Sequence, residues 1–355
     1  MPWSLEGILP CRRQLALEDE LDTFASIDEA PRIALRVHEF QQDFAARDIS
    51  GRLLARLIAA FNDRLTVRVI ELTARRHRMP RVSWCWLALG SEGRHEQSLV
   101  SDQDNGLAFS AIDRNEADAL REIFLPFAQD VNRRLAECGF PLCSGGIMAG
   151  NPAWCLALDE WRQRFYDWVR RPEPEALLNA SIFFDLFPLY GDRDLGEDLR
   201  SLLLSLTADT PAFLHLMAVN ALQAEPPLNF RGDVVAGEGG GNEVDLKKFG
   251  SRIFVDAARI FALSSGVRAV NTSARLHDAG PAAGMQASEI DAVDAAFSHI
   301  LRLRLTRQIA AGAAAAEAGN SVPLDSLNEL DMAILKASLR QARRLQQRLK
   351  LNYAL

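Results

Sequence analysis

Two short apolar segments within a largely helical sequence set the tightest limits on this fold. Residues 83–89 (SWCWLAL) form a nearly continuous apolar run with two tryptophans, and residues 105–109 (NGLAF) form a second run after a polar turn. Runs of this length and composition are typical of buried β-strands. The loop between them is rich in glycine and charged residues, so we expect a functional site where the two strands are joined.

The sequence on the N-terminal side of these strands is helical. Apolar residues recur at intervals of three and four over residues 51–77, which predicts one long amphipathic helix, and Pro80 ends it. A shorter helix is expected over residues 30–46.

The segment after the second strand mixes helices and strands. Asp113 and Glu116 form an N-cap pair that predicts the start of an amphipathic helix. We expect two further strands, at residues 140–148 and 181–190, on either side of a tryptophan-rich helix around residues 154–169. This middle region is therefore mixed α/β, with about the size of one small domain.

The remaining sequence is helical from residue 199 onward, except for a loop at residues 225–245 that contains two prolines and a triple glycine. A chain of 355 residues is too long for one compact core. We predict three parts: an N-terminal helical segment (1–79), a mixed domain (80–195) and a C-terminal helical domain (196–355).

The loop between the two predicted strands carries groups suited to both phosphate and metal. Gly90 and Ser91 follow the first strand directly, and a glycine there lets backbone N–H groups approach a phosphate with no Cβ in the way. Asp102 and Asp104 stand two positions apart at the start of the second strand, so strand alternation directs both carboxylates to the same side. Two carboxylates placed in this way can chelate a hard cation.

This arrangement resembles a known family. A Gly-Ser pair, ten residues and then Asp-x-Asp is the pattern of the polymerase-β-like nucleotidyltransferase superfamily, and the string GSEGRHEQSLVSDQDNGLAF is similar to its branch related to the protein-PII uridylyltransferase. His95 stands where that branch usually has a glycine. The resemblance implies an α+β fold, in which a small mixed-sheet nucleotidyltransferase domain is flanked by N-terminal helices and a C-terminal helical bundle.

Two downstream segments extend the resemblance. Residues 185–192 (DLFPLYGD) are similar to a family strand that ends in Gly-Asp, which makes Asp185 the candidate third metal ligand. Residues 244–252 (VDLKKFGSR) resemble a later family element, in which Lys247 would help to bind the phosphates.

The resemblance implies a Mg²⁺-dependent transferase. Asp102 and Asp104 would hold two Mg²⁺ ions, and Asp185 would complete the second metal site. A hydroxyl of an acceptor protein or small molecule would attack the α-phosphate of a nucleoside triphosphate, and pyrophosphate would leave. The candidate nucleotide-binding residues are Gly90, Ser91, Arg94 and Lys247.

Structural roles are the alternatives for two of these residues. Asp185 lies in an apolar run and could be a buried, hydrogen-bonded acid. Arg94 could pair with Glu92 or Glu96 within the turn. A catalytically inactive nucleotide-sensing module of the same fold is the alternative function.

Composition limits the partners. The net charge of −7 repels a nucleic-acid backbone, which disfavours transfer onto an RNA end. We expect neither a membrane span nor a signal peptide, and therefore a cytoplasmic protein. The five cysteines form no C-x-x-C pair, so the sequence predicts neither a zinc ribbon nor a disulfide framework.

Overall fold

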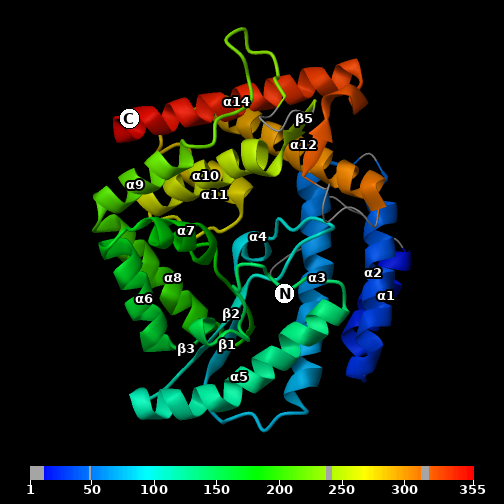
Figure 1. The fold of residues 1–355 in the computed structure, drawn as a ribbon, viewed down its shortest axis with the longest axis vertical. Helices are drawn as coiled ribbons and strands as arrows, with labels where there is room; N and C mark the ends of the chain where they lie inside the picture. The colour runs from blue at the N-terminus through cyan, green and yellow to red at the C-terminus, as the bar shows by residue number, and fades with distance from the viewer. Residues whose placement is uncertain (1–11, 48, 237–241, 313–319) are drawn as a thin grey trace. The chain divides into compact units, whose positions relative to one another are not determined.

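The chain divides into two compact units in the computed structural model, which describes residues 12–47, 49–236, 242–312 and 320–355 (Figure 1). The first unit contains the described residues up to Phe44, then 56–167 and 182–203, and the described remainder forms the second unit. The predicted α+β class is confirmed, since a small mixed sheet occurs together with helices that precede and follow it in the chain. The predicted boundaries at residues 79 and 195 stay a prediction.

A four-stranded mixed sheet forms the centre of the first unit. Its spatial order is β3-β2-β1-β4, and the strands span Trp84–Ala88 (β1), Asn105–Phe109 (β2), Cys155–Ala157 (β3) and Phe187–Gly191 (β4). β1 pairs antiparallel with β2 and β4, whereas β2 pairs parallel with β3. Ala88 lies opposite Asn105, so the expected strands on either side of the charged loop are confirmed as neighbours.

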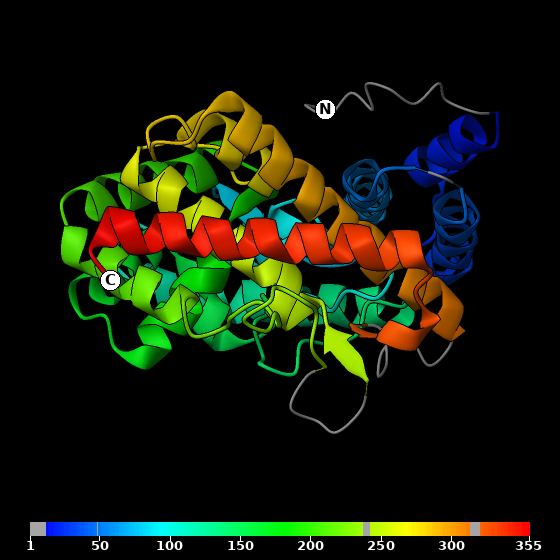
Figure 2. The same cartoon turned by 90° about the horizontal axis from the view of Figure 1, so that it is seen from above.

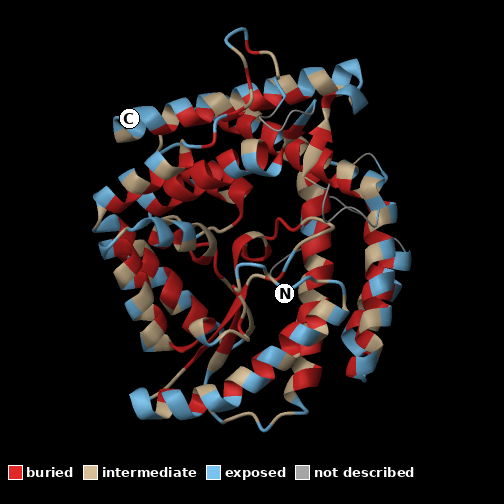
Figure 3. Cartoon of the chain, viewed as in Figure 1, coloured by how far each residue is buried: buried red, intermediate tan, exposed pale blue. Residues whose placement is uncertain are grey.

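Helices α5 (Arg114–Glu137) and α6 (Leu158–Arg170) pack on the sheet through aromatic side chains. Phe124 of α5 stacks on Phe109 with ring centroids 5.0 Å apart. Gly106 faces the opposite side of β2 by strand alternation, and a Cβ there would lie 3.0 Å from the ring of Trp161 in α6. The indole Nε1 of Trp161 donates a hydrogen bond to the carbonyl oxygen of Leu107 at 3.1 Å. Both faces of β2 are therefore covered, and Figure 3 shows this strand as buried.

Three helices precede the sheet in the chain: α1 (Arg12–Thr23), α2 (Ala30–Ala45) and α3 (Gly51–Ala74). The predictions for α2 and α3 are confirmed, and α1 is an addition. The ring centroids of Phe40 and Phe61 lie 5.2 Å apart between α2 and α3, and the Arg68 Nε of α3 donates a hydrogen bond to the Phe24 carbonyl at 2.9 Å.

Two of the predicted strands are corrected. Residues 140–148 form turns, and the strand beside β2 is instead β3, which lies where a helix was expected. The segment predicted as a strand at 181–190 begins as the end of helix α7 (Pro174–Phe183), and β4 starts only at Phe187. A short apolar run fits a buried helix as well as a buried strand, so periodicity alone could not separate the two.

The described part of the second unit is mainly helical. It includes α9 (Pro211–Ala221), α10 (Arg252–Ser264), α11 (Thr272–Ala279), α12 (Ala287–Ala311) and α14 (Glu329–Tyr353), with a short antiparallel pair of β5 (Glu243–Asp245) and β6 (Ser321–Pro323). The nearly wholly buried α10 packs against α9, α11 and α14, and α12 packs against α14 (Figure 2). The triple glycine of the predicted loop lies outside the described residues.

Helix α8 (Arg193–Ala208) joins β4 to α9. No single helix among the described residues has the length and apolar character needed to cross a membrane, and the bent pair α8–α9 meets that test only when its two helices are counted together.

Trp161 tests how much the sheet depends on α6. We expect Trp161→Ala to lower the free energy of unfolding by about 3–5 kcal/mol, because it removes a fully buried aromatic ring. Trp161→Phe keeps most of the apolar contact and leaves the Leu107 carbonyl without its donor, so its expected cost is about 1–3 kcal/mol. Urea unfolding of both variants measures the difference, and equal stability of Trp161→Ala and the parent would contradict this packing.

Candidate active site

The turn after β1 lies directly against the second aspartate of the Asp-x-Asp sequence. Residues 90–93 form the one-turn helix α4 (Gly90–Gly93), which begins with Gly90 at φ +54°. A Cβ on Gly90 would lie 3.0 Å from Oδ2 of Asp104, and the Leu89 N–H donates to the Asp104 carbonyl at 2.9 Å. The structure therefore brings the predicted phosphate turn, which includes Ser91, into contact with a predicted metal ligand.

A buried amide network holds the backbone on either side of Asp104. Gln103 and Asn105 alternate with them along the chain, and both form hydrogen bonds with Asn132 of α5. The Asn132 Nδ2 atom donates to Gln103 Oε1 at 2.7 Å and to Asn105 Oδ1 at 3.0 Å. The network therefore fixes the residues on either side of Asp104 against α5.

Cys143 lies close to the two aspartates. One oxygen of each carboxylate and the Cys143 sulfur all lie within 4.8 Å of one another, with Asp102 exposed and the other two half-buried. Burial raises the pKa of the Cys143 thiol, and the neighbouring Asp104 carboxylate adds to this effect. The sequence analysis missed this residue, because contact between positions 104 and 143 depends on tertiary folding and leaves no signal in local spacing.

Glu92 adds a further acidic group on α4. Its side chain is 7% exposed. Burial raises the pKa of the Glu92 carboxyl well above its usual range, and the negative charges of Asp63 and Asp104 raise it further. The site therefore combines the side chains of Asp102 and Asp104 with a neighbouring carboxyl group whose pKa is raised.

Asp185 forms an ion pair with the turn. It follows α7 and precedes β4 in the chain, and its side chain is fully buried. Its Oδ2 atom accepts a hydrogen bond from Arg94 Nη1 at 2.6 Å. Arg94 also donates through Nε to Glu96 at 2.8 Å. A Cβ on Gly93 would lie 1.9 Å from the Asp185 carbonyl oxygen, so this backbone contact is tight. Among the described residues, the acidic cluster with close ligand atoms contains Asp102, Asp104 and Cys143, while Asp185 contacts the same turn through Arg94.

His95 continues the turn in a left-handed conformation, with φ +55°. Its Nδ1 atom lies 3.0 Å from an Asp63 oxygen, and its ring meets the Phe187 ring edge-on at 4.6 Å. Side-chain contacts thus hold a backbone shape that glycine adopts most readily.

Lys247 belongs to the second unit, at the start of a π-helical turn (Lys247–Ser251). Its backbone N–H donates to Asp245 Oδ1 at 2.8 Å, which caps this turn. A role for the Lys247 side chain in nucleotide binding stays a prediction.

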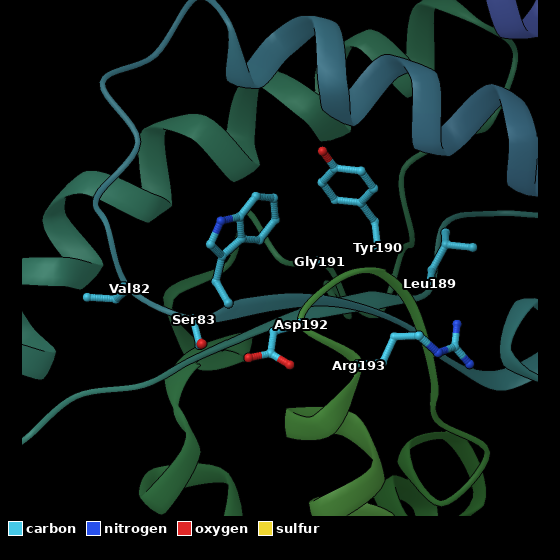
Figure 4. Close-up of a pocket in the computed structure, with 8 residues that line it drawn as sticks. Val82, Ser83, Leu189, Tyr190, Gly191, Asp192 and Arg193 are labelled. Carbon is cyan, nitrogen blue, oxygen red and sulfur yellow. The ribbon is translucent and has the colours of Figure 1, made fainter.

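A shallow pocket of about 540 Å³ lies at the other end of the sheet (Figure 4). Residues 82–84 and 189–193 line it, where β1 begins and β4 ends. It contains none of the predicted site residues: Gly90, Ser91, Arg94, Asp102 and Asp104 lie between β1 and β2 in the chain, Asp185 precedes β4, and Lys247 belongs to the second unit.

Comparison with known families agrees with this geometry. Residues 35–175 match the family model "Putative nucleotidyltransferase DUF294", and residues 211–353 match "Putative nucleotidyltransferase substrate binding domain". The chain belongs to a nucleotidyltransferase family. No curated protein matches it. The first match includes the turn and the Asp-x-Asp sequence of this nucleotidyltransferase, whereas Asp185 lies beyond its end and Lys247 lies in the second match. The closer relation to the protein-PII uridylyltransferase branch stays a prediction.

The buried pair of Arg94 and Asp185 gives a stability prediction for this nucleotidyltransferase. We expect Arg94→Met to lower the free energy of unfolding by about 3–5 kcal/mol, because it removes the ion-pair partner of a fully buried carboxylate. The double variant Arg94→Met/Asp185→Leu should recover most of that loss. As a control, Arg162→Met removes the exposed pair with Asp198 and should cost about 0–1 kcal/mol. Equal losses of unfolding free energy in Arg94→Met and Arg162→Met would show that the buried pair stabilises the fold no more than the exposed pair does.

Proposed function

We propose that this nucleotidyltransferase uses Mg²⁺ to transfer a nucleoside monophosphate from a nucleoside triphosphate to a hydroxyl group of a protein or small molecule. A regulatory role like that of the protein-PII uridylyltransferase is part of the proposal. One observation carries it: the backbone of Gly90 lies against the Asp104 carboxylate, so a phosphate beside α4 would be next to the metal-binding aspartates.

The donor set fits Mg²⁺. This ion prefers oxygen ligands, keeps several waters and is usually bound through one or two carboxylates together with substrate phosphates. Asp102 and Asp104 supply two carboxylates, and the exposure of Asp102 leaves room for water and phosphate oxygens. When bound there, Mg²⁺ would polarise the α-phosphate and lower the pKa of the acceptor hydroxyl.

The protein's own residues would prepare this chemistry by holding the groups that bind metal and phosphate in place before the substrate binds. The hydrogen bonds of Asn132 hold Gln103 and Asn105, so the backbone on either side of Asp104 is fixed before a ligand binds. Gly90 removes the side chain that would separate a phosphate from the backbone N–H groups of the turn. Oriented donors of this kind lower the cost of reorganisation during phosphoryl chemistry.

Arg94 contributes to this arrangement through Asp185. Its guanidinium contacts Asp185 and Glu96, so direct contact with a phosphate would require one of these ion pairs to open. We propose that Arg94 positions Asp185 and that Asp185 supports the second metal site.

The same ion pair favours one alternative function. A catalytically inactive nucleotide-sensing module would keep Asp185 neutralised by Arg94 and would bind nucleotide without turnover. Incubation with each labelled nucleoside triphosphate and Mg²⁺ separates the two possibilities. Release of pyrophosphate with label on an acceptor supports the transferase, and tight binding without pyrophosphate supports the sensing module.

Charge removal at the aspartate pair tests the metal site. We expect Asp102→Asn and Asp104→Asn each to lower the transfer rate at least about a hundredfold, because an amide lacks the charge that a hard cation requires. Asp118→Asn, on the exposed side of α5, is the matched control and should keep the parent rate. Radiolabel transfer measures all three, and near-normal rates in both site variants would refute the assignment.

A side chain at Gly90 tests the phosphate turn. We expect Gly90→Val to weaken triphosphate binding measurably in calorimetry, because its branched side chain would crowd the Asp104 carboxylate, which lies 3.0 Å from the Cβ position, and would block the approach of phosphate to the turn. Gly266→Val is the control for backbone strain, since Gly266 also has positive φ (+67°) but its Cβ would meet no atom within 4 Å. Similar affinities in the two folded variants would locate the phosphate elsewhere.

A further inference from the structure

Cys143 places a sulfur atom beside the two proposed magnesium ligands. Its Sγ atom lies within 4.8 Å of a carboxylate oxygen from Asp102 and one from Asp104. The thiol also forms a hydrogen bond with the Asp104 carboxylate. Three ligand atoms of two chemical kinds therefore lie close together, and a site built only for Mg²⁺ does not need the sulfur.

Backbone hydrogen bonds from the segment that carries the aspartates hold the segment that contains Cys143. The backbone N–H groups on either side of Asp104 bind the segment that contains Cys143: Gln103 donates to the Pro141 carbonyl at 3.0 Å, and Asn105 donates to the Ile147 carbonyl at 3.2 Å. A tight turn closes this segment, since the Gly146 N–H donates to the Cys143 carbonyl at 2.9 Å. Cys143 is thus held opposite Asp104 by hydrogen bonds on both sides of the contact.

We propose that Cys143 completes a thiophilic metal site with Asp102 and Asp104, and that Zn²⁺ binds there in competition with Mg²⁺. This inference rests on the proposed function in that both cations share the two aspartates. Its consequence is that Zn²⁺ inhibits transfer by replacing Mg²⁺ at the site.

The ligand chemistry separates the two cations. Mg²⁺ takes oxygen donors and gains little from sulfur, whereas Zn²⁺ binds thiolate and carboxylate together in tetrahedral sites. Binding of Zn²⁺ forms a zinc–sulfur bond in place of a zinc–water bond, and the thiol proton passes to solvent. The two carboxylates and the thiolate fill three positions, which leaves the fourth for water.

Cys138 provides a matched control. It is half-buried like Cys143 and follows α5 directly, but it lies outside the three-residue cluster. Substitution of Cys138 removes a thiol of similar exposure and leaves the proposed site intact.

The test uses Cd²⁺ as a spectroscopic substitute for Zn²⁺ on the full chain without Mg²⁺. The parent and Cys138→Ser should develop a thiolate-to-cadmium absorption band that saturates at one equivalent, and Cys143→Ser should lack it. In calorimetry, Cys143→Ser should bind Zn²⁺ at least about tenfold more weakly than the parent. Cys143→Ala and thermal unfolding show that any loss reflects the missing ligand and not misfolding.

A second measurement separates this inference from the proposed function. Zn²⁺ inhibition is expressed relative to each variant's own Mg²⁺-supported rate, and Cys143→Ser should need at least about ten times more Zn²⁺ for half-inhibition. A full cadmium band or parent-like Zn²⁺ affinity in folded Cys143→Ser overturns the inference, whatever the transfer rate. Cysteine-dependent Cd²⁺ binding in a parent chain that transfers no label supports the thiophilic site and removes only the proposed activity.

Discussion

The amide of Asn132 is the interaction on which the geometry of the site depends. This buried side chain on α5 donates hydrogen bonds to both Gln103 and Asn105, and so fixes the residues on either side of Asp104. Its Oδ1 atom accepts a hydrogen bond from the Gly150 N–H at 2.8 Å, which attaches the segment leading to β3 as well. A shift of one residue in this segment would break the hydrogen bonds of Asn132 with Gln103 and Asn105. Unsatisfied buried amides are costly, so the network makes such a shift unfavourable.

The sequence contained enough local information to predict β1, β2 and the closeness of the two aspartates, because apolar runs and residue spacing are short-range signals. It predicted the turn at Gly90 for the same reason. Residues 140–148 were assigned wrongly, because their backbone hydrogen bonds go partly to the Asp-x-Asp segment, a long-range pairing that residue pattern does not encode. The position of Cys143 follows from that pairing and was missed with it. The ion pair of Asp185 with Arg94 matches the structural alternatives that the sequence left open, and only the tertiary structure identifies the partner.

The electrostatics of the site link cation binding to folding. Asp63 and Asp104 lie close enough to Glu92 for their charges to raise the pKa of its carboxyl, in a region where burial weakens solvation. Close acidic groups oppose the compact state when they are ionised. The cation proposed for Asp104 would offset this repulsion in the folded chain alone, and would stabilise the folded state by mass action.

The left-handed His95 shows how the turn obtains its shape. A non-glycine residue with positive φ costs roughly 1–2 kcal/mol in the folded protein. Contacts with Asp63 and Phe187 offset that cost before any ligand arrives. A glycine in the same place would leave the turn many conformations, and a ligand would have to select one of them at an entropic cost. With histidine, that ordering is completed during folding, and less of the binding free energy is spent on arranging the loop.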